Sequence, residues 1–284
     1  MVCGLRQTVT RPRTGAFLLG GRETPRSLNR TDILRNCVVG SLLLLLPLLV
    51  SCAAVTPGGQ PPQQAVASAH PLATRAGIEV LDAGGNAFDA AVAVSAALAV
   101  VEPYSSGIGG GGFWLLHRAS DGKQTMIDGR ERAPRAAHPD LYLDELGEVI
   151  PGASMDGALA AGIPGEPAAL AHLAQHYGRL PLSRSLAPAI RLAASGFQVD
   201  EHYRKMAQFR LPALRRSQPA AEIFLRQGEV PRPGALIRQT DLADTLRALA
   251  NGGRRGFYEG EVAEQMVAGV RAGGGIWTLD DLKH

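Results

Sequence analysis

NAFDAAVAVSAALAVVEPYSSGIGGGGFWLLHRASDGKQTMIDGRERAP, residues 86–134, is the stretch of this sequence that constrains the fold most. Asn86 is a suitable helix N-cap, with Asp89 three residues later. Alanine and other apolar residues follow, until Pro103 prevents the helix from continuing. The sequence therefore predicts a helix over residues 87–101.

A glycine-dense turn and a hairpin follow this helix. Within residues 105–112 only Ile108 is neither glycine nor serine, so the backbone is free to adopt positive φ and to be approached closely by another group. Residues 113–118 are typical of a strand, residues 119–122 of a turn and residues 123–128 of the partner strand.

Arg130 comes directly after the second predicted strand. Its guanidinium is a planar fork of donors that suits a carboxylate held by two parallel hydrogen bonds. This placement indicates a site for an anionic small molecule. From spacing alone, a surface arginine paired with the neighbouring Glu131 explains the pattern equally well.

Gly107, Gly109 and Gly112 also satisfy the G-x-G-x-x-G spacing of dinucleotide-binding loops. That motif requires a strand before the glycines and a helix after them, so that the helix N-terminus faces the pyrophosphate. Here the helix comes first and the strand second, so nucleotide binding is disfavoured.

Several long runs resemble the γ-glutamyltransferase (glutathione hydrolase) family. They are the run quoted above, GIPGEPAALAHLAQHYGRLPL from Gly162, LAPAIRLAASGF from Leu186, IRQTDLADTLRALA from Ile237 and GFYEGEVAEQMVAGVRAGGGIWTLDDL from Gly256. The resemblance implies an α+β chain, the large-subunit portion of an N-terminal-nucleophile hydrolase fold with αββα layers and a helix-rich C-terminal part. It implies γ-glutamyl compounds such as glutathione as substrates, Arg130 as the group that binds their α-carboxylate, and no metal or organic cofactor.

The same resemblance identifies what is not in this sequence. The family's nucleophile is a threonine that becomes the N-terminus of a small subunit cut from the same precursor, and it opens a Thr-Thr-His-like run. No threonine here is followed by Thr or His. We therefore expect no catalytic nucleophile in this chain, a small subunit as its partner, and no activity of the chain alone. Thr278 and Asp281 form a capping-box pattern whose helix the sequence only begins, so we expect the polypeptide to continue.

Two alternatives remain open. The first is an acylase of the same family that cleaves β-lactam side chains of the glutaryl or cephalosporin type. The second is a catalytically dead lipoprotein.

Three segments are expected along the chain. Residues 1–52 have a net charge of +5, from seven Arg against Glu23 and Asp32, and include an apolar run that ends in Val-Ser-Cys52. This resembles a bacterial lipoprotein signal with Cys52 as the lipidated residue, although an ordinary signal peptide with an incidental cysteine is the alternative. Residues 53–64, rich in Pro, Gly and Gln, read as a tether, and residues 65–284 as the folded domain. We therefore expect an exported protein, periplasmic or at the cell surface, anchored by lipid to a bacterial membrane.

The total net charge of +3 leaves 3 − 5 = −2 for residues 53–284, which argues against a nucleic-acid partner. Hydrophobic periodicity and capping residues predict further helices over 71–83, closed by Gly84, over 166–177, with Gly178 as C-cap, and over 186–194. Two more are predicted, one after a Thr240 cap and one through Val262, Met266 and Val270. His172 and His176 lie four residues apart on one of these helices, but away from its apolar stripe, so a solvated pair is favoured over a metal site.

Overall fold

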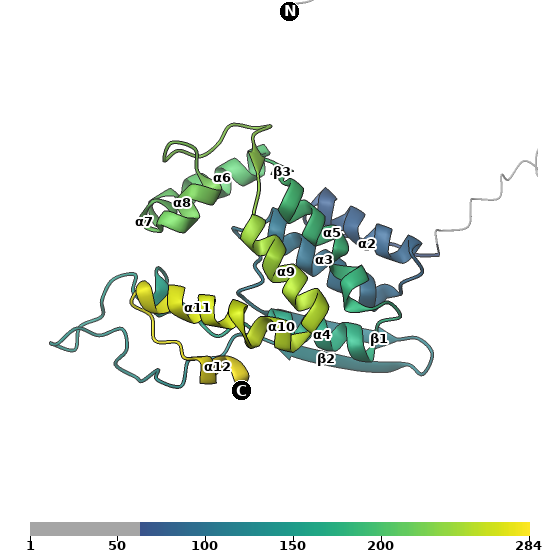
Figure 1. The fold of residues 1–284 in the computed structure, drawn as a ribbon, viewed down its shortest axis with the longest axis horizontal. Coiled ribbons are helices and arrows are strands. Elements are labelled where there is room, and N and C mark those ends of the chain that lie inside the picture. The colour runs from purple at the N-terminus through teal and green to yellow at the C-terminus, as the bar shows by residue number, and fades with distance from the viewer. Residues whose placement is uncertain (1–62) are drawn as a thin grey trace, which may run out of the picture. The chain divides into compact units, whose positions relative to one another are not determined.

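A computed structural model describes residues 63–284 (Figure 1). The expected signal sequence, Cys52 and most of the expected tether lie outside the described residues. Within the described part, no helix combines the length and the apolar character needed to cross a bilayer. The described residues form one compact unit of many helices and two small two-stranded sheets.

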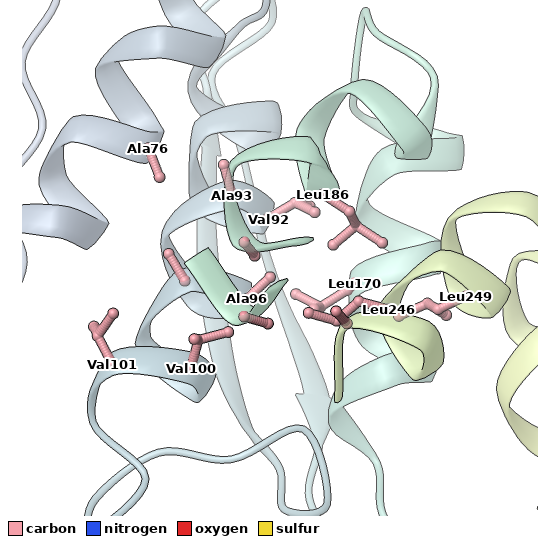
Figure 2. Close-up of a cluster of buried hydrophobic side chains, with 14 of the residues drawn as sticks. Ala76, Val92, Ala93, Ala96, Val100, Val101, Leu170, Leu186, Leu246 and Leu249 are labelled. Atoms are coloured by element: carbon pink, nitrogen blue, oxygen red, sulfur yellow. The ribbon is translucent and has the colours of Figure 1, made fainter. Parts of the chain in front are cut away.

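Four helices enclose the main core: α2 (Pro71–Asp82), α3 (Ala87–Val101), α5 (Leu182–Ser195) and α9 (Thr240–Gly252). Helix α3 packs against α2 and α5, and α5 packs in turn against α9. Figure 2 shows the alanines of α3 facing larger side chains from its neighbours. Small side chains let two helix backbones approach closely, and leucines fill the remaining space. The fully buried core residues include Val92, Ala93, Ala96, Val100, Leu170, Leu186, Leu246 and Leu249.

Helix α3 has the predicted bounds, and Asp89, the partner of its N-cap Asn86, also binds the chain that follows α4. The Asn86 side chain accepts hydrogen bonds from the α3 amides, and the Asp89 carboxylate accepts one from the Asn86 amide at 2.9 Å. Fully buried, that carboxylate also accepts hydrogen bonds from the amides of Arg179 and Leu180. The start of α3 is therefore fastened to the chain that leaves α4.

The predicted hairpin is confirmed as β1 (Gly112–Arg118) paired with β2 (Lys123–Gly129). Helix α4 (Glu166–His176) packs against β2, and the Trp114 indole donates to the Ser95 hydroxyl of α3 at 3.3 Å. In Figure 1 this hairpin lies along the lower margin of the helical body. One face of the hairpin thus contacts helices, while its other face carries exposed apolar side chains, namely Phe113, Leu115 and Met126.

The remaining elements complete the unit around this frame. They are η1 (Ala158–Ala160), β3 (Phe197–Gln198), α6 (Glu201–Phe209), α7 (Leu211–Arg216), α8 (Gln218–Phe224), β4 (Leu236–Ile237), α10 (Arg254–Tyr258), α11 (Glu261–Ala272) and α12 (Leu279–Lys283). Strands β3 and β4 pair antiparallel. The chain is accordingly α+β and rich in helix toward its C-terminus.

Three local sequence predictions are wrong in detail. Helix α5 begins at Leu182 rather than 186, directly after its N-cap Pro181, and continues through Pro188. Thr240 is the first residue of α9 rather than its cap, which is Gln239. Gly178 follows the C-cap Tyr177 and needs no positive φ; a Cβ there would lie 2.4 Å from the Asp89 carboxylate. Close approach, not left-handed backbone, is what requires this glycine.

Candidate functional site

The backbone of Arg130 is held between two glycines from different parts of the chain. A Cβ on Gly111 would lie 2.2 Å from the Gly129 carbonyl oxygen, and a Cβ on Gly165 would lie 2.3 Å from the same atom. No side chain can occupy either position without moving the backbone, because real Cβ atoms do not approach oxygen so closely. Because neither glycine has a side chain, the backbone of residues 129–130 can lie against both of them, and this contact sets the position of Arg130 at the end of β2.

The glycine loop is joined to helix α4 by the carbonyl of Gly110. That single oxygen accepts hydrogen bonds from the amides of Gly165 and Glu166, at 3.0 and 3.1 Å. The sequence suggested that the glycines of this loop allow either positive φ or close approach by another group. None of the glycines from 107 to 112 has positive φ, so close approach at Gly111 is the reason the structure supports.

The Arg130 side chain lies at the surface with 61% of its area exposed. Its Nε donates to the Glu131 carboxylate at 2.9 Å, and its guanidinium carbon lies 5.9 Å from the centre of the Phe113 ring. Its two terminal nitrogens make no hydrogen bond within residues 63–284. The ion pair with Glu131 is present, yet it occupies only one edge of the fork.

Arg130 also lines an open groove of about 710 Å³ between the end of β2, helix α4 and the C-terminal helices. Ala168, Tyr258 and Leu282 contribute to its walls. The Tyr258 hydroxyl donates to the Pro164 carbonyl at 2.8 Å, which ties α10 to the turn before α4. The arginine therefore stands at the edge of a cavity large enough for a small organic ligand.

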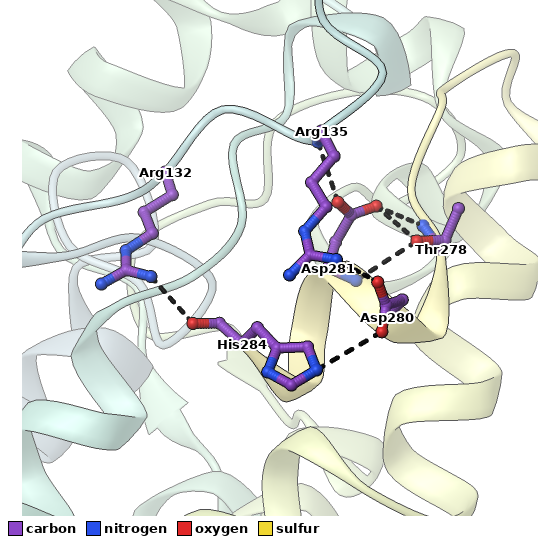
Figure 3. A network of polar contacts seen from close by, with 6 residues as sticks. All are labelled: Arg132, Arg135, Thr278, Asp280, Asp281 and His284. Atoms are coloured by element: carbon purple, nitrogen blue, oxygen red, sulfur yellow. Dashed lines mark hydrogen bonds and ion pairs between the residues drawn. The ribbon is translucent and has the colours of Figure 1, made fainter.

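The segment after Arg130 is fastened to helix α12 (Figure 3). Arg132 donates to the main-chain oxygen of His284 at 2.8 Å, and the amide of Arg135 donates to Asp281 at 2.8 Å. The Arg135 guanidinium pairs with Asp280. The predicted capping box of Thr278 and Asp281 is confirmed in both directions.

Asp281 is the shared acceptor in this network. Burial alone would raise the pKa of its carboxyl, but hydrogen bonds from the Arg135 amide and from Thr278 hold that pKa below the usual value. The carboxylate therefore stays charged and joins the loop that carries Arg130 to the last helix.

The other sequence candidates can be located as well. His172 and His176 stack with ring centres 4.1 Å apart and are both exposed, as expected for a solvated pair. Within residues 63–284 no group of three or more His, Cys, Asp or Glu side chains is arranged to hold a metal ion. Asp128 accepts a hydrogen bond from the Arg130 amide at 3.0 Å, so it shapes the turn.

Sequence reasoning missed Glu166. Glu166 follows Pro164-Gly165 and begins an amphipathic helix. In the sequence it is indistinguishable from an ordinary acid in a first helical turn, which interacts favourably with the helix dipole. In the structure only 7% of the residue is exposed, and it lines a second cavity together with Ser105 and Ser106. A buried carboxylate at a helix start has no distinct signal in one sequence, because burial depends on the distant glycine loop.

Most of the described chain is similar to known proteins. The family model described as gamma-glutamyltranspeptidase matches residues 73–284. The glutathione hydrolase proenzyme of Pseudomonas sp. (strain A14) is 44% identical over 218 residues, which are 76% of this chain and 38% of that relative. The chain belongs to the γ-glutamyltranspeptidase family.

Solved structures of the family extend the likeness to three dimensions. A crystal structure of Helicobacter pylori gamma-glutamyltranspeptidase matches 80% of this chain and 65% of its own, with a TM-score of 0.76 and 38% identity. A cephalosporin acylase from Bacillus halodurans matches 79% of this chain and 45% of its own, with a TM-score of 0.65 and 34% identity. This γ-glutamyltranspeptidase-family chain thus spans less than half the length of the curated relative, 38%, and of the acylase, 45%.

Proposed function

We propose that the chain forms the donor-binding part of an enzyme that transfers or hydrolyses γ-glutamyl groups, with Arg130 holding the donor's α-carboxylate. The observation that carries this proposal is the free fork of Arg130 at the edge of the 710 Å³ groove. Two parallel N–H donors match the two oxygens of a carboxylate, so the fork is suited to that group more than to a neutral one.

The neighbours of Arg130 would orient the fork. Glu131 holds Nε at 2.9 Å, and the Phe113 ring lies 5.9 Å from the guanidinium carbon. These two contacts limit rotation of the long side chain, which lowers the entropy lost when a ligand binds. The terminal nitrogens then face the ligand in an orientation set before it arrives.

The attacking group would come from a second polypeptide, the small subunit of the same precursor. Its threonine hydroxyl would attack the γ-amide carbonyl and release the amine, and water or an amino acid would then take the acyl group. The exposed outer face of the hairpin supports such a partner. Phe113 is 56% exposed, Leu115 78% and Met126 63%, an apolar face that suits a second sheet packed in αββα layers.

Export and anchoring belong to the same proposal. Lipidation at Cys52 would hold the folded domain at the outer side of a bacterial membrane, with residues 53–64 as the tether. Labelling of cells with a radioactive fatty acid tests it: wild type should incorporate label and Cys52→Ala should not.

The decisive assay uses the complete precursor with its nucleophile-bearing half. Arg130→Ala should lower kcat/KM for a γ-glutamyl anilide by about 100-fold or more, since removing one partner of a charged hydrogen-bonded pair costs about 2–5 kcal/mol. Precursor cleavage, followed on a gel, should continue. Arg130→Lys should also be impaired, because a point charge does not replace the fork.

Arg118→Ala is the matched control, since Arg118 is an exposed arginine of the same hairpin, ion-paired with Asp121. Its turnover should equal that of the wild type. Near-normal turnover of Arg130→Ala would defeat the assignment.

The likeness to the cephalosporin acylase keeps a second candidate. A glutaryl amide carries a terminal carboxylate that Arg130 could hold equally well, but it lacks the α-amine of a γ-glutamyl group. Turnover of glutathione and of a glutaryl amide by the complete enzyme would separate the two. We expect the γ-glutamyl donor to be preferred.

A further inference from the structure

A second cavity lies between the glycine loop and the first turn of helix α4. Its volume is about 290 Å³, and it does not include Arg130. Its polar lining comes from three serines, of which Ser95 accepts from the Trp114 indole, from glycine backbone and from two carboxylates. Its apolar lining comes from Leu98, Phe113 and Trp114. The carboxylates belong to Glu131 and Glu166.

Glu166 is buried, with 7% of its area exposed, and it lines this cavity. Its carboxylate makes no hydrogen bond or ion pair with any described residue. Of the other buried acids, Glu102 likewise has no side-chain hydrogen bond or ion pair among the described residues, but it does not line this cavity. Asp89 and Asp281 each accept hydrogen bonds from several backbone amides. The enclosed, unpartnered side-chain atoms of the described residues are the Ser185 hydroxyl and Arg204 Nε, so the Glu166 oxygens are accessible from the cavity. A carboxylate that has little water around it and no protein partner is free to bind a group that enters this cavity.

Glu131 adds a second negative charge to the same space. One of its carboxylate oxygens accepts from Arg130 Nε, and the other would lie 3.3 Å from a Cβ on Gly110, so it faces the glycine loop. Burial, and then the charge of Glu131, raise the pKa of Glu166 to about 8. Tyr258 of α10 is the other titratable group whose pKa responds to Glu166. A cation in the cavity would relieve both the burial cost and the repulsion.

The chemistry of the lining indicates which cation fits. Carboxylate and hydroxyl oxygens accept hydrogen bonds, so a ligand with several N–H donors satisfies them better than one with none. Aromatic and leucine walls suit a short alkyl chain behind the charge. The described residues provide no cluster of metal ligands here.

We propose that the cavity lined by Glu166, Glu131, Ser105 and Ser106 binds a primary ammonium group. The ammonium can belong to a free amine or amino acid, or to a lysine side chain of a polypeptide packed against the glycine loop. The proposal does not depend on the γ-glutamyl assignment, because the cavity excludes Arg130 and its test measures binding, not turnover.

Calorimetric titration of the 284-residue chain with ethylammonium chloride at pH 9 tests the proposal. Ionic strength is held constant with tetramethylammonium chloride, which has no N–H donors. Wild type should bind ethylammonium saturably at one site, and Glu166→Gln should weaken binding at least about tenfold, the loss expected for one charged hydrogen bond. Glu222→Gln, an exposed acid of α8, is the matched control and should bind like wild type.

Parallel titrations with L-alanine and with N-acetyl-lysine methylamide identify the source. Tighter binding of the amino acid indicates a free ligand, and tighter binding of the lysine mimic indicates a polypeptide. Glu166→Gln is nearly isosteric, and circular dichroism will check that it remains folded. Absence of saturable binding by any of the three amines to folded wild type, or equal affinity in Glu166→Gln, would overturn the proposal.

Discussion

The helical core and the Arg130 region are built by opposite means. In the core, alanines of α3 face larger side chains of neighbouring helices, such as Leu186 of α5 and Leu170 of α4, and side chains fill the space between the helices. Around Arg130, backbone packs directly against backbone, which is possible because Gly111 and Gly165 have no side chain. The core tolerates exchange among apolar residues of similar volume, whereas Gly111 and Gly165 leave no room for an added atom. The backbone at Arg130 is thus positioned by close packing, although it lies outside a helix.

The largest effect expected from breaking this comparison is that of Gly111→Ala. The added methyl would overlap the Gly129 carbonyl at 2.2 Å and press on the Arg130 backbone, so β2 and the glycine loop must separate. We expect the free energy of unfolding to fall by on the order of 3 kcal/mol, as for other overpacked buried sites. Urea unfolding of the 284-residue chain measures the loss.

Gly109→Ala is the matched control for that experiment. A Cβ at Gly109 meets no atom within 4 Å, and the residue does not have positive φ. Its free energy of unfolding should stay within about 0.5 kcal/mol of the wild type, as for ordinary surface substitutions. Equal losses in the two variants would show that the glycine packing is not what holds this region together.

A smaller effect on stability is expected at Glu166, a mostly buried acid near Arg130 whose carboxyl has no hydrogen-bond partner among the described residues. The pKa of Glu166 is about 8 in the folded chain and near 4.5 when unperturbed. Between these values the native state keeps a proton that the unfolded state has lost, so stability falls as the pH rises and levels off above about pH 8.

Glu166→Gln should remove this slope. Measured at pH 9 relative to pH 5, the variant should gain on the order of 1–3 kcal/mol over wild type, less than the full shift implies because water can enter the cavity. Urea unfolding at several pH values will give both curves. Parallel curves for wild type and variant would mean that Glu166 is not buried as a neutral acid.

The same contrast explains what one sequence can and cannot predict. Helix α3, its capping pair and the hairpin follow from local patterns, since a cap, an apolar run and a turn are each written within a few residues. Arg130 could be named as a candidate from the sequence because a strand end beside glycines is also a local feature. The pairing of Gly165 with the Gly129 carbonyl, and the burial of Glu166, join segments that no short pattern connects.

Helices α6, α7 and α8 illustrate a different failure. Their sequences are short, and Pro212 and Pro219 each lie near the start of a helix, where proline is tolerated. From the sequence, no helix is predicted in this region. Only contacts such as Tyr203 against Phe197 and Tyr104 select this region's structure. In this region tertiary packing, rather than local helix propensity, determines which residues are helical.

The central claim is that Arg130 recognises a carboxylate. The most direct measurement compares two donors for the complete enzyme: a γ-glutamyl anilide, and the same compound with its α-carboxylate converted to a primary amide. Wild type should prefer the carboxylate in kcat/KM by about 100-fold or more, and Arg130→Ala should use both donors at similar low rates. An undiminished preference for the carboxylate in Arg130→Ala would contradict the claim.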